Sequence, residues 1–181
     1  MTPQLKRVNA VIDLLPERRV ATIESAFLGA RGVQAGTSVP VKVYLRPYCG
    51  ERLEREIQVK IPAGLPKGEH RILLSDADLL NRLQSVAGAA NRYLDLPETV
   101  SLINQERSNN RLYVSLVQAR PTYYEDDKTL PSLPASVSNV MQAGRSASRP
   151  LISSAESTQE QMSLPFEYMV SGSQSLRINV R

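Results

Sequence analysis

The sequence predicts a mainly β fold with a small helical insertion, and three observations carry this prediction. From Gly36 to Asp76, apolar and polar side chains alternate in three short segments, which is the two-residue period of half-buried strands. Two connectors rich in proline and glycine separate these segments, as is typical of turns. After Asp76 the apolar residues recur at helical spacing instead. We therefore expect packed sheets with one helical stretch.

The composition fits a single domain. The chain has 181 residues, of which 41% are hydrophobic, and we expect one β domain over residues 1–181. No apolar run approaches the ~20 residues that a membrane helix needs, so no membrane span is expected. The net charge of +4 comes from basic residues scattered among acidic ones, with no basic block. This pattern argues against a nucleic-acid partner.

Two strands are expected before the organising segments. Val8, Ala10, Ile12 and Leu14 alternate with polar neighbours, which predicts an opening strand that ends at Leu15-Pro16. Residues 20–28 form the second candidate, but apolar residues occupy both parities, so the sequence leaves its buried face open.

The three organising segments predict neighbouring antiparallel strands. Their connectors, residues 46–51 and 62–68, are too short for a parallel crossover. Together with the two earlier strands they predict an immunoglobulin-like β-sandwich. The residues expected on the buried face are Val39, Val41, Val43, Leu45, Ile57, Val59, Ile61, Ile72 and Leu74.

A helical insertion is predicted over about residues 76–104. Ser75 or Asp76 suits the N-cap of a first helix. A second short helix is expected to begin around Pro97. The apolar positions are Leu79, Leu80, Leu83, Val86, Ala87 and Ala90 in the first helix, and Leu96, Val100 and Ile103 in the second.

The rest of the chain is expected to combine strands with long loops. Residues 111–119 alternate as a strand, whereas about 120–160 is predicted to hold long loops, beginning with a proline-punctuated acidic stretch. The chain is expected to close with a hairpin, residues 162–170 and 176–180, around the turn Ser171-Gly172-Ser173. Pro165 places the first of these strands at a sheet edge or bulge.

Candidate catalytic and metal-binding residues have simpler structural explanations. His70 is the only histidine and Cys49 the only cysteine, and each is interpreted as structural or inert because nothing in the spacing supplies partners. Asp76 and Asp78 suit a helix N-terminus, and residues 125–127 a solvated loop. We predict no catalytic residue, no metal site and no cofactor.

One polar run suits the recognition of a ligand. Arg107, Asn109, Asn110 and Arg111 offer donors and acceptors for a peptide or a glycan. The competing interpretation is a turn whose asparagine side chains bond their own backbone. Exposed strand edges are a further binding mode, because an extended peptide can add to a sheet.

Several short strings over most of the chain share a likeness to one family. They are Leu45-Arg46-Pro47-Tyr48, Lys60-Ile61-Pro62, Pro66-Lys67-Gly68, Leu74-Ser75-Asp76, the run from Ser101 to Leu116, and Val170-Ser171-Gly172-Ser173. The chain thereby resembles the C-terminal region that follows the peptidase domain in bacterial proteins of the SpoIVB-type serine peptidase family. The resemblance implies a secreted or cell-envelope protein whose partner is the peptidase domain of the same full-length chain, or another envelope protein.

The resemblance does not extend to an active site. That family's nucleophile lies in a Ser-Gly-Ser-Pro type motif, whereas this chain has Ser171-Gly172-Ser173-Gln174. The expected function is therefore a non-catalytic accessory or protein-interaction domain. The alternatives are an independent adhesion or carbohydrate- or peptide-binding module and, third, a hydrolase that uses a serine with His70. The sequence does not fix the oligomeric state.

Overall fold

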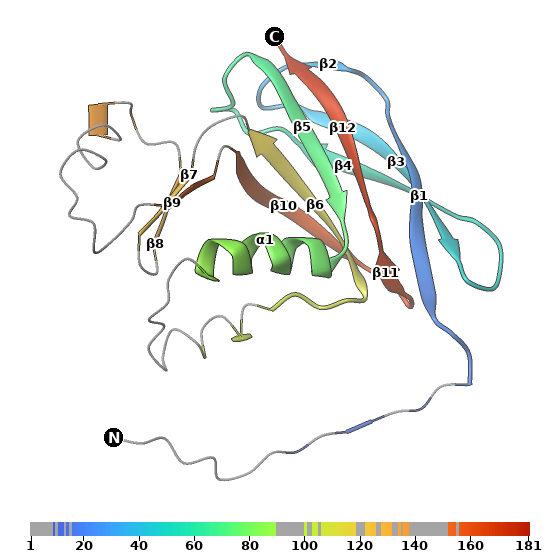
Figure 1. Cartoon of the computed structure of the whole chain (residues 1–181). Coiled ribbons are helices and arrows are strands. Elements are labelled where there is room, and N and C mark those ends of the chain that lie inside the picture. The colour runs from blue at the N-terminus through green and yellow to red at the C-terminus, as the bar shows by residue number, and fades with distance from the viewer. Residues whose placement is uncertain are drawn as a thin grey trace, which may run out of the picture.

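The computed structural model describes most of the chain and is mainly β (Figure 1). The described residues are 9, 11–12, 14, 16–89, 100, 103–104, 106–118, 122–125, 128–131, 134, 136–137, 152–154 and 156–181. The elements are β1 (Val20–Leu28), β2 (Gly32–Val33), β3 (Ser38–Pro47), β4 (Leu53–Lys60), β5 (Gly68–Ser75), α1 (Ala77–Ala89), β6 (Arg111–Gln118), β7 (Thr122–Glu125), β8 (Lys128–Pro131), β9 (Ile152–Ser154), β10 (Ser157–Pro165), β11 (Met169–Ser171) and β12 (Ser173–Val180).

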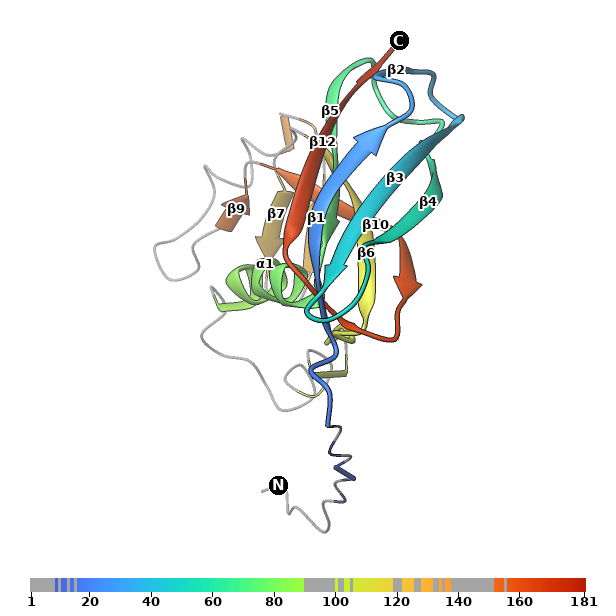
Figure 2. The same ribbon diagram turned by 90° about the vertical axis from the view of Figure 1, so that its right-hand side faces the viewer.

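Two sheets face each other around one apolar core (Figures 1 and 2). The four-stranded sheet has the order β11-β1-β3-β4, and the five-stranded sheet has the order β10-β6-β5-β12-β2. Alternate residues of both sheets point inwards, as expected for stacked sheets. Every residue predicted for the buried face lies in this core, which also includes Ala21, Ile23, Leu112, Val114, Leu116, Val170, Ile178 and Val180.

The strand order differs from that of an immunoglobulin domain. Among the long strands, the first three along the chain, β1, β3 and β4, share one sheet, and β5, β6, β10 and β12 share the other. In the seven-stranded immunoglobulin arrangement the first, second, fourth and fifth strands share a sheet. The mainly β prediction is confirmed, and the agreement with an immunoglobulin domain stops at two stacked sheets.

The two connectors of the organising segments behave differently. The first joins β3 and β4 as a hairpin, with Leu45 opposite Leu53 and Ser38 opposite Lys60, so antiparallel pairing is confirmed there. The second leads from β4 in one sheet to β5 in the other, and the predicted pairing is wrong. Ile61 and Leu65 are buried in this connector, so the chain crosses the end of the core instead of turning back.

A bulge in β1 explains why its buried face was ambiguous. Ile23 pairs with Leu45 and Ser25 with Tyr44, which leaves Glu24 as an extra residue. Before the bulge Ala21 and Ile23 enter the core, and after it Ala26 and Leu28 pack against the core. Odd-numbered residues point into the core before Glu24, and even-numbered residues do so after it. Apolar residues at both odd and even positions therefore belong to one buried face.

The predicted opening strand is wrong for the residues that the structure describes there. Val11, Ile12 and Leu14 lie outside any strand and are 80–92% exposed. A strand needs a neighbour for its main-chain groups, and β1 already lies between β3 and β11. Apolar alternation alone therefore does not make a strand, because β1, the next strand along the chain, offers no free edge to pair with.

The predicted closing hairpin is also wrong. β11 pairs in parallel with β1, whereas β12 pairs antiparallel with β5, so the two strands lie in different sheets. Gly172 joins them with φ of 95° and lets the chain pass from one sheet to the other. β10 is an edge strand that ends at Pro165, and the predicted edge position is confirmed.

Part of the stretch predicted as long loops forms a third sheet, with the order β8-β7-β9. It lies beside the five-stranded sheet, away from β1 and β3 (Figure 1). β7 and β8 form a hairpin in which Glu125 faces Lys128. The sequence Thr122-Tyr123-Tyr124 is rich in strand-forming residues, and this preference outweighs the acidic turn that suggested a loop.

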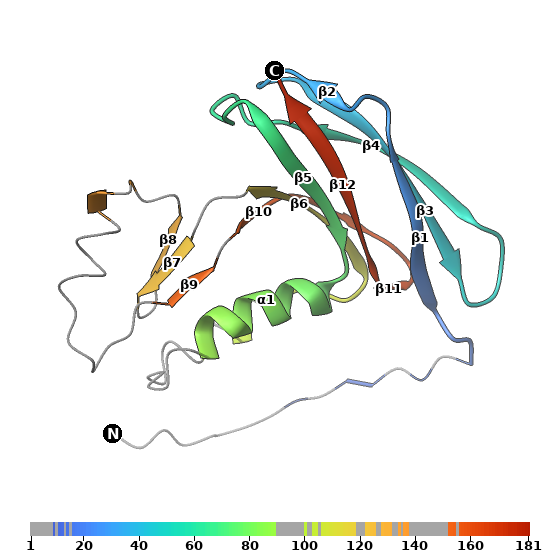
Figure 3. The same ribbon diagram turned by 45° about the horizontal axis from the view of Figure 1, so that its top comes forward.

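The helix α1 confirms the first part of the predicted insertion. The Leu79 N–H donates to Asp76 Oδ1 at 2.8 Å, so Asp76 is the N-cap. Its other oxygen accepts the Gly172 N–H at 2.7 Å. Figure 3 shows α1 against the five-stranded sheet on the side away from β1.

The second helix is only partly described. Pro97 and Leu96 lie outside the described residues, and Val100 and Ile103 are helical but exposed. Their predicted apolar stripe therefore does not face the core.

Candidate functional site

The two arginines of the predicted binding run are engaged within the fold. Arg107 Nε donates to Glu160 Oε2 at 3.0 Å, and its main-chain N–H donates to Asn81 Oδ1 at 3.2 Å. Arg111 Nε donates to Ser163 Oγ at 3.1 Å. The bonds of Arg107 connect the segment before β6 to α1 and to the edge strand β10, and the bond of Arg111 connects β6 itself to β10. Both arginine side chains thus form hydrogen bonds that stabilise the fold.

The two asparagines of the run form an exposed turn that anchors the following segment. The carbonyl of Asn109 accepts the Val170 N–H at 2.9 Å, and that of Asn110 accepts the Phe166 N–H at 2.8 Å. Asn110 Oδ1 accepts the Ser108 hydroxyl at 2.7 Å. The turn interpretation is supported by this geometry, although the Asn110 side chain bonds a hydroxyl and not the backbone. A ligand-binding role for the four residues stays a prediction.

Tyr113 links this turn to the covered face of the five-stranded sheet. It is 4% exposed and packs with Ala77 and Leu80 of α1. Its hydroxyl donates to the Ser108 carbonyl at 3.0 Å. Burial raises the pKa of Tyr113, and the nearby Glu160 carboxylate raises it further.

His70 and Cys49 lie in separate surroundings. His70 is 7% exposed on β5, and its Nε2 lies 2.8 Å from the Pro66 carbonyl, so this nitrogen carries the proton. It braces the connector between β4 and β5. Cys49 is exposed in the turn between β3 and β4. Within the described part of the chain, no three His, Cys, Asp or Glu side chains gather as a metal site would need.

The outer face of the four-stranded sheet carries stacked aromatic and arginine side chains. The Arg52 guanidinium lies 4.0 Å from the centroid of the Tyr44 ring, and Phe27 meets the same ring edge-on at 5.9 Å. The Arg18 guanidinium lies 4.6 Å from the centroid of the Tyr48 ring. We call these five residues the Tyr–Arg face. Phe27 and Tyr48 are 59% and 65% exposed, although aromatic rings are usually more buried.

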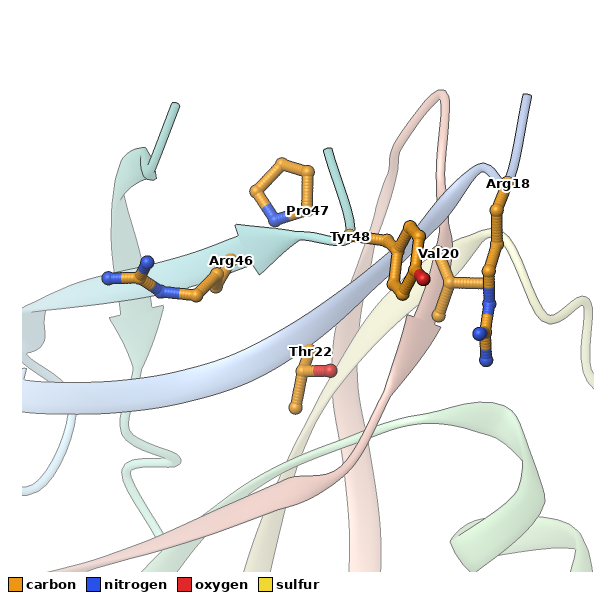
Figure 4. A pocket seen from close by; sticks show the side chains of 6 residues that line it. All are labelled: Arg18, Val20, Thr22, Arg46, Pro47 and Tyr48. Carbon is orange, nitrogen blue, oxygen red and sulfur yellow. The ribbon is translucent and has the colours of Figure 1, made fainter. Parts of the chain in front are cut away.

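A hollow of about 300 Å³ opens at one end of the Tyr–Arg face (Figure 4). In Figure 4 the Tyr48 ring and Arg18 stand on either side of Val20, while the Arg46 side chain points away from them. Six residues from β1, β3 and the segments that flank these strands line the hollow: Arg18, Val20, Thr22, Arg46, Pro47 and Tyr48.

Ion pairs hold the charged residues around the Tyr–Arg face. Glu24, the bulged residue of β1, accepts from Arg52 Nε at 2.8 Å and from Arg46 Nη2 at 3.4 Å. Lys42 Nζ lies 3.3 Å from Glu54, and this hydrogen bond raises the pKa of Lys42. Because these groups are exposed, their contribution to stability is small. The main effect of Glu24 is to fix Arg52, the arginine that stacks on Tyr44.

Sequence reasoning missed this face, although part of its signal was present. The alternation in β3 placed Lys42, Tyr44 and Arg46 together on the outer side. The partners Arg18 and Arg52 come from loop positions that no periodicity marks. Two tyrosines, Tyr44 and Tyr48, each two residues from Arg46, were the available clue.

The chain matches no protein-family model, no curated protein and no solved structure. Among the described helices, none has the length and apolar character needed to cross a membrane.

Proposed function

We propose that this chain is a non-catalytic protein-interaction domain that binds its partner through the Tyr–Arg face. The observation that carries the proposal is the presence of two tyrosine–arginine stacks on one sheet face, with Tyr48 exposed and Tyr44 half-buried. Tyrosine and arginine are enriched among the residues that dominate binding energy at protein interfaces. The ion pair with Glu24 holds Arg52 on the Tyr44 ring before binding, which lowers the entropy lost on association.

The charge of the hollow favours an acidic segment of the partner. Arg18 has no carboxylate partner among the described residues, whereas Arg46 and Arg52 share Glu24. A guanidinium over an aromatic ring keeps its edge donors available for a carboxylate. An acidic side chain of the partner would complete this arrangement beside Tyr48.

The resemblance to the SpoIVB-type serine peptidase family supports a peptidase domain as the partner. On that basis the chain is an accessory domain of a secreted or envelope protein, and the peptidase domain of the same full-length chain is the partner. The coding sequence upstream of Met1 tests whether a peptidase domain belongs to the same chain. An in-frame peptidase segment is expected there, and its absence would remove the accessory role.

A binding measurement tests the surface itself. The peptidase segment, expressed separately, is titrated with this chain by isothermal calorimetry. Arg18→Ala and Tyr48→Ala should each weaken binding about tenfold or more, as hot-spot residues do. Arg177→Ala is the matched control, because Arg177 is an exposed arginine of β12 in the other sheet. Equal effects of all three variants would rule out the Tyr–Arg face as the binding surface.

A further inference from the structure

Among the described strands of the two stacked sheets, β4 is a long edge that only charged side chains, and no proline or bulge, protect. The opposite edge of its sheet, β11, has three residues, and β2 at one end of the other sheet has two. The remaining edge, β10, carries a bulge after Glu160 and ends at Pro165, which are usual protections against strand addition. β4 has eight residues, no proline and no bulge against β3. Its free side is therefore open to another strand.

The register with β3 decides which groups of β4 reach the free side. Pro40 lies opposite Gln58, has no N–H, and directs its carbonyl to Gly29 on the β1 side. The Ile61 N–H continues the ladder by donating to Thr37 at 2.8 Å. Odd-numbered residues of β4 therefore bond β3, since main-chain groups alternate in direction along a strand. The outward N–H and C=O groups belong to Glu54, Glu56, Gln58 and Lys60.

This edge is complementary to itself. When a second β4 runs antiparallel with a two-fold axis at Ile57, Glu54 faces Lys60 of the copy and Glu56 faces Gln58. Outward main-chain groups then meet outward groups, and each facing pair exchanges two hydrogen bonds. The charged ends also attract, because opposite charges across two strands stabilise the pairing.

We propose that two copies of this chain pair through β4 in this register, so that their four-stranded sheets form one continuous sheet. The contact is isologous and closed, as in most soluble homodimers. It leaves the Tyr–Arg face of each copy on the same side of the joined sheet. The proposal is independent of the partner proposed above.

Other registers are less favourable. A parallel copy in register places Glu54 beside Glu54 and Lys60 beside Lys60, so like charges repel. An antiparallel copy centred on Glu56 sets that residue against itself. Centring on Gln58 keeps an attraction between Glu56 and Lys60 but pairs fewer residues. The axis at Ile57 therefore combines the longest overlap with opposite charges.

One side chain must move for the pairing. Arg55 Nη1 donates to the Glu54 carbonyl at 3.2 Å and thus occupies one outward acceptor. Arg55 is exposed, so its guanidinium can return to water without leaving a buried charge. The Lys60 N–H of the copy takes its place.

A proline substitution tests the main-chain contact. The Gln58 N–H makes no bond to β3, so Gln58→Pro removes an outward donor while keeping the ladder inside the chain. Sedimentation equilibrium over a dilution series should show a dimer for the natural chain and for Gln58→Ala. Gln58→Pro should weaken the dimer about tenfold or more, since each copy loses a hydrogen bond. A natural chain that stays monomeric throughout the series, or a dimer that Gln58→Pro leaves intact, overturns the proposal.

A charge exchange tests the register and does not depend on how the proline variant folds. Lys60→Glu should weaken the dimer, because it places two carboxylates opposite each other at both ends. Adding Glu54→Lys to Lys60→Glu restores opposite charges and should restore the dimer. Circular dichroism and the unfolding temperature of each variant check that the fold persists. A dimer that is indifferent to Lys60→Glu would contradict the register.

Discussion

The outer faces of the two stacked sheets differ in burial: a helix covers one, and the other is largely exposed. On the five-stranded sheet, α1 covers β5 and β6, and Ser75, Tyr113 and Ser115 are at most 4% exposed. On the four-stranded sheet, the outward residues of β3 and β4 are exposed or half-buried and carry rings and charges. One face therefore contributes to stability by burial, and the other remains largely exposed to solvent. Substitutions on the two faces should separate these roles.

The largest difference is expected when a tyrosine is removed from each face. Tyr113→Ala should lower the free energy of unfolding by about 3–5 kcal/mol, the range for removing a buried aromatic side chain. Tyr44→Ala should cost about 1 kcal/mol or less, because its contacts with Arg52 and Phe27 are made at the surface. Urea unfolding of both variants measures the two values. Similar losses would mean that the two faces do not differ as described.

The helix that covers the five-stranded sheet depends on its N-cap. Asp76→Ala should lower the free energy of unfolding by about 1–2 kcal/mol, because the bond to Leu79 N–H is lost and so is the bond to Gly172 N–H. Asp78→Ala is the matched control, since Asp78 lies in the first turn without capping it. Thermal or urea unfolding of the two variants gives the comparison. An Asp78 variant that loses as much as the Asp76 variant would argue that helix-dipole charge is the cause.

The passage from β11 to β12 depends on a left-handed residue. Gly172→Ala should cost about 1 kcal/mol, because an alanine at φ of 95° is strained. The added Cβ would meet Thr22 Cγ2 at 3.7 Å, which is ordinary contact, so backbone strain dominates. Gly64→Ala, at a position with open space and no positive φ, should be close to neutral or stabilising. Equal costs in urea unfolding would show that conformation is not the cause.

The smallest expected effect concerns pH and the buried tyrosine. Burial raises the folded-state pKa of Tyr113 above 10.0, the ordinary value for a tyrosine. Below pH 10 both states keep the proton, and above it the unfolded chain ionises first, so stability is lost as the pH rises through the folded-state pKa. Tyr113→Phe lacks this group. The stability advantage of the natural chain over Tyr113→Phe should therefore shrink above pH 10, and a constant advantage would contradict the burial of the hydroxyl.

Local patterns predicted the core strands of the two stacked sheets, but they missed the third sheet and assigned strand partners poorly. The alternation in residues 39–45 and 57–61 identified the buried face, since every residue of it lies in the core. The connector at residues 62–68 and the turn at residues 171–173 were interpreted as joining paired strands, but both lead the chain from one sheet to the other. A turn signal specifies a local change of direction, whereas the sheet that a strand joins depends on long-range packing.

For the candidate site, too, local patterns were visible in the sequence, whereas long-range contacts were not. The polar run 107–111 was visible in sequence, but its bonds to Asn81, Glu160 and Ser163 depend on elements far along the chain. The Tyr–Arg face needs Arg18 and Arg52 to reach rings on β3 and its turn. Such pairs arise only when the sheet has formed, so composition and spacing do not reveal them.

The proposed role of the Tyr–Arg face is tested most directly by mapping where a partner binds. Amide nuclear magnetic resonance shifts of the labelled chain are recorded while the separately expressed peptidase segment is added. We expect the shifts to concentrate at residues 18–28 and 42–52, with residues 71–80 and 107–111 unchanged. Shifts confined to 107–111, or to α1 and the covered sheet, would contradict the account.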